Sequence, residues 1–206
     1  DKDSIRWFRG PSLTMALFAK RMCEAVKKRW PDKKVIYLPY WNYQECPTKL
    51  DFPDNLVVQV AMTTWPMPLR AQDEILQGSI KSLRAWRSKA CMPVTVWDYS
   101  VGWTHGPYQY PPVVADFYPK VKDIVSGVFI NGENLGEWTN TAPTLYVWMK
   151  AMWNPKLDVD AMLDEMCRRL FGKAGATARE MVRLECDLWE KGQWRNSRVK
   201  VPGGWF

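Results

Sequence analysis

The chain of 206 residues has one histidine, His105, and no two cysteines in a Cys-x-x-Cys arrangement. Its five cysteines show no zinc-site spacing with that histidine, and their odd number argues against a complete disulfide framework. A solitary histidine also argues against a nucleophilic triad. We therefore expect no metal and no other cofactor, and His105 is a candidate only for contact with a ligand.

Two further absences bear on the partners of the chain. No stretch of about 18 apolar residues occurs, so we predict no membrane span. The net charge of +7 is spread along helices among Asp and Glu, and we expect no nucleic-acid partner. A nucleic-acid-binding protein would show one basic face and a steep loss of affinity with salt. The chain shows no signal peptide and starts at Asp1 instead of Met, which indicates a processed product or a fragment.

Tryptophan, by contrast, is abundant, with 13 residues in the chain. Trp rings are large and amphipathic, and this density indicates ring-stacking surfaces as well as a core. The segment 95–112, TVWDYSVGWTHGPYQYPP, gathers two Trp, three Tyr, one Asp and the only His. A core explains its first residues, whereas the Tyr, His, Gln and Pro that follow are typical of an exposed loop.

Apolar patterns predict helices that alternate with strands over the first 140 residues. The predicted strands lie at 33–41, 55–64, 92–100 and 126–134. The predicted helices lie at 10–30, capped by Ser12, at 74–89, capped by Asp73, and more weakly at 112–124, where Pro119 interrupts the pattern. Strands separated by helices imply βα units and a parallel sheet. The fold class is therefore α/β, with four units that make up about half of a (β/α)8 barrel in residues 1–140.

The remainder of the chain, 141–206, is predicted to form helices that pack on the barrel. The predicted segments are 144–153, 159–170 and 176–191, with an irregular tail after them. The middle helix has the clearest signals, with Asp158 as its N-cap and Gly172 as its end. Helical spacing places Trp148 and Trp153, together with Cys23, Cys167 and Cys186, in the core.

Candidate site residues follow from the rule that reactive groups lie just past the carboxyl ends of parallel strands. Each predicted strand end carries aromatic residues, and three of the four carry an acid. Sugar rings pack on aromatic faces, and sugar hydroxyls need amide and carboxylate partners. The candidate substrate-binding residues are Trp41, Asn42, Glu45, Trp97, Tyr99, Trp103, His105, Asn131 and Trp138. The candidate catalytic acids are Asp98 and Glu133, because glycosidic cleavage uses two carboxyl groups.

Each acid also has a structural interpretation. Asp98 can cap a turn or accept hydrogen bonds from loop amides. Glu133 lies in the turn-like run NGEN, and Glu45 lies in YQECPTK, which is compatible with a solvated loop. The sequence leaves these alternatives open.

Five segments between about residues 15 and 190 carry a resemblance to a known family. They are AVKKRWPDKKVIYLPYWN, PDNLVVQV, VTVWDYS, SGVFINGE and LYVWMKAMWNPKLDVDAMLDEMCRRLFGKAGATAREM. With them, the chain resembles the C-terminal part of a bacterial glycosidase-like family. That family carries a domain of unknown function and is related to α-glucuronidases and β-hexosaminidases with barrel folds. In place of an expected His or Cys motif after the second strand, this chain has TTWPMP.

The resemblance implies a (β/α)8 catalytic barrel, of which this chain would hold the last four strands. Its partner would be the missing N-terminal half of the barrel. The implied activity is O-glycosyl hydrolysis of glycans that contain uronic acids or amino sugars, in an extracellular or periplasmic protein, with Asp98 and Glu133 as late-strand acids. The alternative is a non-catalytic carbohydrate-binding protein on the same scaffold. A separation of about 5 to 10 Å between the two carboxyl groups would favour hydrolysis.

Overall fold

Four strands form one parallel sheet in the computed structural model, which describes residues 2–47, 49–62, 74–98, 111–131, 138–154 and 156–190. The strands are β1 (Val35–Tyr37), β2 (Leu56–Met62), β3 (Val94–Asp98) and β4 (Val125–Ile130), and neighbours in the chain are neighbours in the sheet. The helices around them are α1 (Lys2–Arg29), α2 (Glu74–Arg87), α3 (Pro111–Val121) and α4 (Trp138–Ala151). The predicted alternation of strand and helix and the predicted parallel pairing are therefore confirmed.

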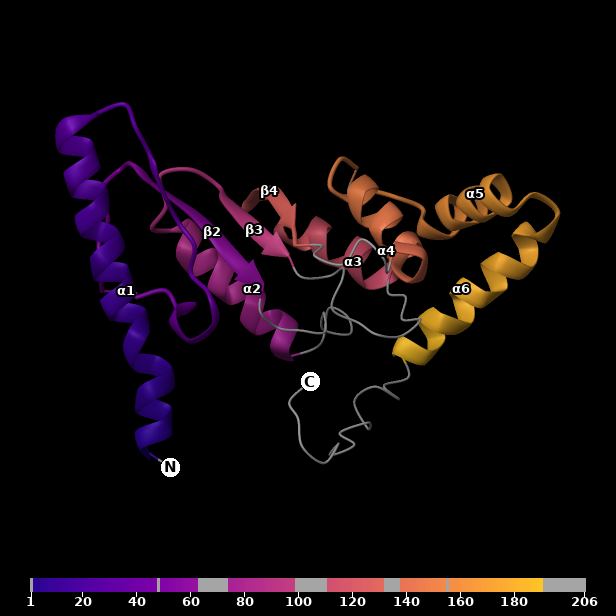
Figure 1. Ribbon diagram of the computed structural model, residues 1–206, viewed down its shortest axis with the longest axis horizontal. Coiled ribbons are helices and arrows are strands. Elements are labelled where there is room, and N and C mark those ends of the chain that lie inside the picture. Colours follow the sequence, from indigo (N-terminus) through magenta and orange to yellow (C-terminus); the bar gives the residue numbers. More distant parts are fainter. Residues whose placement is uncertain are drawn as a thin grey trace.

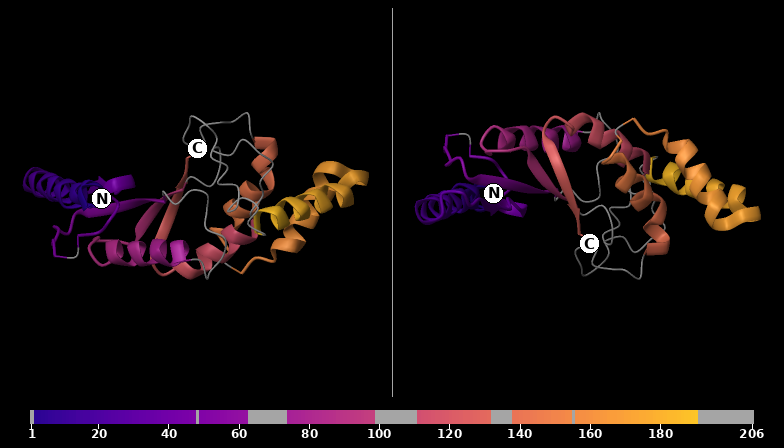
Figure 2. Two further views of the ribbon diagram at one scale, coloured as in Figure 1. Left: turned by 90° about the horizontal axis from the view of Figure 1, so that it is seen from below. Right: turned by 90° about the horizontal axis from the view of Figure 1, so that it is seen from above.

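The helices are arranged as one curved layer outside the sheet. Helices α2 and α3 lie against one face of the strands, and α1 and α4 lie at the two ends of the same arc (Figure 2). This arrangement is that of consecutive βα units, and it is consistent with half of a barrel. A pair of helices, α5 (Val159–Phe171) and α6 (Gly175–Glu190), projects away from the sheet beyond α4 (Figure 1).

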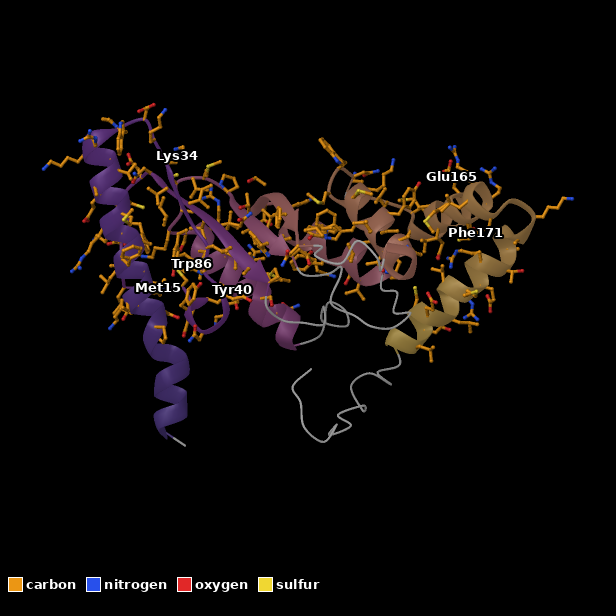
Figure 3. The ribbon with its side chains drawn as sticks, viewed as in Figure 1. Met15, Lys34, Tyr40, Trp86, Glu165 and Phe171 are labelled. Carbon is orange, nitrogen blue, oxygen red and sulfur yellow. The ribbon has the colours of Figure 1, made fainter. Side chains whose placement is uncertain are left out.

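The main core lies between the sheet and this helical layer. Alternate residues of the strands, such as Val58 and Val96, are fully buried against α2 and α3. From α2, Trp86 packs into the same cluster (Figure 3), and from α3 so does Phe117. The apolar composition of β2 and β3 explains this burial, because strands of a parallel sheet lie under covering helices.

A second, smaller core joins α5 and α6 to α4. It contains Val147 of α4, Leu163 and Cys167 of α5, and Val182 of α6. The predicted N-cap of α5 is confirmed, since the Asp158 carboxylate accepts a hydrogen bond from the Ala161 amide at 3.0 Å.

The predicted end of α5 is also confirmed. Gly172 has φ of +53°, in the region that disfavours side chains, and its N–H donates to the Arg168 carbonyl. The five cysteines are all free thiols, and those predicted to be core residues, Cys23, Cys167 and Cys186, are buried.

Three local predictions are wrong. Helix α1 begins at Lys2 and continues through Pro11, so Ser12 lies inside the helix. The Ser12 hydroxyl donates to the Asn42 carbonyl at 3.4 Å, and this tertiary contact replaces the capping role. Pro119 lies inside α3 without ending it, because Tyr118 and Val121 on either side of it are held in the core. Trp153 is 90% exposed, since it follows the end of α4 in a turn.

No described helix combines the length and the apolar character that crossing a membrane requires.

Candidate functional site

Asp98 is the last residue of β3 and points toward the helical layer. The burial of β3 alternates, with Val94, Val96 and Asp98 on the helix side, and Asp98 is only 1% exposed. Its carboxylate oxygen Oδ2 accepts two hydrogen bonds, from the Tyr118 hydroxyl of α3 at 2.7 Å and from Nε1 of Trp148 in α4 at 2.9 Å. One carboxylate therefore links a strand end to two helices.

The two donors are chemically constrained. The indole N–H of Trp148 can only donate a hydrogen bond. Burial, and then the neighbouring Asp98 carboxylate, raise the pKa of Tyr118 well above its usual value, so that its hydroxyl keeps its proton. The rings of Tyr118 and Trp148 meet edge to face with centroids 6.0 Å apart. Together these contacts hold the Asp98 carboxylate in one orientation.

Asn131 lies beside Asp98 at the carboxyl edge of the sheet. Its backbone N–H donates to the Asp98 carbonyl at 2.8 Å, which continues the pairing of β3 with β4, and Asn131 is buried. The structure thus brings together two of the predicted site residues. Glu133 lies outside the described residues, so the predicted separation of the two carboxyl groups stays a prediction.

The opposite side of the sheet, here called the inner face, consists of the strand residues that point away from the helices. Its members include Ile36, Gln59, Ala61, Thr95, Trp97, Gly127 and Phe129. Trp97 lies between Ala61 and Phe129 in register, and its ring centroid is 4.3 Å from that of Phe129. Phe129 is 46% exposed, so an aromatic surface is accessible on the inner face. It lies one position before the ends of β3 and β4.

The segment after β1 is fastened beside the carboxyl end of β2. The Gln44 side chain donates to the Ala61 carbonyl, and Nε1 of Trp86 donates to the Gln44 carbonyl at 2.8 Å. Asn42, in the short 3-10 helix η1 (Trp41–Tyr43), is half-buried, and Glu45 is exposed. These contacts place the Asn42 and Glu45 segment at the same edge of the sheet as Asp98 and Asn131.

The remaining predicted site residues are not placed in space. Tyr99, Trp103, His105 and Glu133, as well as the run TTWPMP, lie outside the described residues. Trp41 and Trp138 begin η1 and α4, but their side chains are outside the described part of the chain. Their predicted contacts with a substrate stay predictions.

The structure adds three residues that sequence reasoning did not select. Phe129 pairs in register with Trp97 of the neighbouring strand. Because side chains alternate between the two faces of a strand, this alternation would have indicated that Phe129 shares a face with Trp97. Trp148 was predicted to be a core residue, and its burial confirms this, but nothing in the sequence signals its hydrogen bond to Asp98. The same holds for Tyr118, which helical packing alone brings to the strand end.

The described ranges show no metal-binding group, and two of their buried thiols are unreactive. They contain no group of three His, Cys, Asp or Glu side chains positioned for a metal ion. Burial raises the pKa of the Cys23 and Cys46 thiols to about 11, which keeps them protonated at neutral pH.

Fold and site together define an α/β protein with a parallel sheet and a buried, doubly hydrogen-bonded carboxylate at its carboxyl edge. The chain belongs to the family described as a domain of unknown function (DUF4838), whose family model matches residues 9–183. No curated protein and no solved structure matches the chain.

Proposed function

We propose that the chain is the C-terminal part of a glycoside hydrolase-like (β/α)8 barrel that cleaves glycans containing uronic acids or amino sugars. The observation that carries this proposal is the combination of residues at one edge of the sheet. Asp98 ends β3 and Asn131 directly follows β4, and one position earlier in these strands the rings of Trp97 and Phe129 meet on the inner face. Carboxylate, amide and aromatic groups are the partners that a saccharide needs.

The hydrogen bonds to Asp98 support a division of roles. Hydrolysis requires a protonated carboxyl that donates to the leaving oxygen and an ionised carboxylate that attacks the sugar or activates water. Tyr118 and Trp148 both donate to Oδ2 of Asp98, so this oxygen serves as an acceptor and does not deliver a proton. We assign the ionised role to Asp98 and the proton-donor role to Glu133, which follows β4.

A barrel requires the missing N-terminal half as a partner, and three features support this. Among the described strands, β1 and β4 each pair with one neighbour only. On the inner face, Ile36 is 70% exposed, although parallel sheets are normally covered on both faces. At the end of the arc, α1 leaves Leu13 and Phe18 exposed. Unpaired strand edges and exposed apolar side chains favour contact with further βα units.

A second candidate function is carbohydrate binding without catalysis, and the burial of Asp98 favours it. A carboxylate that lies on the helix side of the sheet can join α3 and α4 to β3 without touching a ligand. The sugar would then contact Trp97 and the polar residues of the neighbouring segments. This function needs no second acid.

The two candidates are separated by activity measurements on the product of the complete coding sequence. The substrates are chromogenic uronides, hexosaminides and neutral hexosides, and glycan binding is measured in parallel. Under the hydrolase proposal, Asp98→Asn and Glu133→Gln each lower kcat by about 100- to 10,000-fold, as expected for loss of one acid–base group. Asp116→Asn is the matched control, because Asp116 is an acid of α3 that pairs with Lys120 of the same helix.

Two outcomes contradict the hydrolase proposal. If no substrate is cleaved while glycan binding is retained, the protein is a carbohydrate-binding module. If cleavage occurs but Asp98→Asn and Asp116→Asn behave alike, Asp98 is a structural anchor and the catalytic acid lies elsewhere.

A further inference from the structure

Helices α5 and α6 project beyond the sheet next to α4 (Figure 1), and residues of these three helices form one apolar surface. It contains two hollows, of about 330 and 350 Å³, which share Ala142, Met166 and Leu170 in their walls. The first, here called the α6 hollow, is lined by residues of α6 as well as of α4 and α5, and the second, the α4 hollow, is lined by residues of α4 and α5. We call this surface the hairpin groove and define it by the residues that line the two hollows.

Several large apolar side chains around the hairpin groove are exposed. Leu170, between the two hollows, is 66% exposed, and Met149 and Met181 on either side of it are also exposed. Phe171 lies where α5 ends and is likewise exposed (Figure 3). Contiguous exposed apolar residues of this kind mark contact sites.

The hairpin groove also carries one charge at each hollow. Glu185 lines the α6 hollow, and among the described residues it has neither a hydrogen bond nor an ion pair. Partial burial there raises the pKa of its carboxyl. Arg169 lines the α4 hollow and its side chain is largely exposed; among the described residues it pairs with Glu165 of its own helix. The surface thus has an acid on one side of Leu170 and a base on the other.

We infer that the hairpin groove is an interface between two copies of this chain, related by a two-fold axis. A two-fold contact places the same patch of both copies face to face, so each residue is opposite a different residue of the partner. With Leu170 near the axis, Arg169 lies opposite Glu185 of the partner subunit, and Glu185 lies opposite Arg169 of the partner subunit. A second copy therefore supplies the missing counter-ion and covers the exposed Leu170, Phe171 and Met181.

The opposite charges on one surface favour this occupant. A separate helical partner would have to be basic at one end and acidic at the other to match both hollows. A second copy has this pattern without any further assumption. The inference is independent of the proposed function, because none of these residues lies at the carboxyl edge of the sheet.

Sedimentation equilibrium of the 206-residue chain over a range of concentrations tests the inference. We expect a monomer–dimer equilibrium in which Glu185→Arg and Arg169→Glu each raise the dissociation constant by about tenfold or more, since like charges then meet. The double variant, with both charges exchanged, restores the dimer. Glu180→Arg is the matched control, because Glu180 lies on the same helix and pairs with Arg183. Circular dichroism confirms that each variant is folded.

A monomer at every concentration overturns the inference. So does a dimer that neither single reversal weakens, because the contact would then use another surface, such as the edge of β4. If both single variants weaken the dimer and the double variant does not recover it, the two charges do not face each other and the two-fold arrangement is wrong.

Discussion

Tyr37 shows how a single polar atom in the core can oppose folding. Its ring meets Trp86 edge to face, with centroids 5.5 Å apart, and the residue is buried. Among the described residues, its hydroxyl has no hydrogen-bond partner. Burial raises the pKa of Tyr37 above its usual value, because the ionised form would lose its hydration.

Replacement of this hydroxyl tests that account. Tyr37→Phe should raise the free energy of unfolding by about 1 kcal/mol at neutral pH, since an unpaired buried group is removed. The pKa of Tyr37 is higher in the folded state than the unfolded value of about 10, so the free energy of unfolding of the wild type is unaffected by this group below pH 10 and falls as the pH rises further. Urea unfolding between pH 8 and pH 11 should therefore show a weaker pH dependence in Tyr37→Phe. Tyr146→Phe serves as control, and equal slopes in wild type and Tyr37→Phe would contradict the prediction.

At the scale of residues, the sequence predicts which groups meet better than where they point. That Asp98 and Asn131 are neighbours followed from the common carboxyl edge of parallel strands. The direction of Asp98 did not follow, because successive strand residues face opposite sides and a shift of one residue reverses every side chain. The predicted strand, 92–100, was longer than β3 and left this parity undetermined. The partners Tyr118 and Trp148 are 20 and 50 residues away in the chain, beyond any local signal.

Among the elements, the turn between α5 and α6 depends on a close approach of two backbones. A Cβ atom on Gly175 would lie 2.9 Å from Cα of Arg168 and 3.1 Å from the Cys167 carbonyl oxygen. Both are backbone atoms, so a side chain at this position requires the end of α5 to move. Arg179 of α6 adds ion pairs to Asp160 and Asp164 of α5, at 2.6 and 2.8 Å.

Two glycine substitutions should therefore have opposite effects. Gly175→Ala is expected to lower the free energy of unfolding by about 1 to 3 kcal/mol, as overpacking does. Gly78→Ala, in the middle of α2, should raise it by up to about 1 kcal/mol, because the new methyl group meets no atom within 4 Å and alanine favours the helix. Urea unfolding followed by circular dichroism measures both. Equal changes in the two variants would show that the close approach at Gly175 relaxes without cost.

The elements that were predicted well are those whose limits are set by local chemistry. Helix α5 has a capping carboxylate before it and a glycine after it, and both signals act within a few residues. Helix α1 was predicted to start too late, because Gly10 and Pro11 are breaking signals that this helix accommodates. Its buried side also differs from a typical apolar stripe, since the small residues Ala16, Ala19 and Cys23 face the core.

For the whole molecule, the inner face has different surroundings in a half barrel and in a complete one. Ile36 is on this face, largely exposed and opposite Val57 of β2. In a closed barrel the same position would point into the packed interior. The proposed completion of the barrel therefore changes what this residue tolerates.

A charge at this position distinguishes the two situations. Ile36→Lys should change the free energy of unfolding of the 206-residue chain by no more than about 0.5 kcal/mol, as surface substitutions do. In the product of the complete coding sequence the same change should cost about 3 to 5 kcal/mol, the range for an uncompensated buried charge. Chemical denaturation of both proteins provides the comparison. A small effect in both would mean that the inner face stays in water and that no further strands close the sheet.

Helix α4 is shared by the two cores, since Trp148 and Ala151 belong to the main cluster and Val147 to the smaller one. The polypeptide therefore has two hydrophobic cores that meet along α4. Thermal fluctuations can separate the outer pair of helices while the strands keep their hydrogen bonds, so protection of amide protons would fall in two stages instead of one.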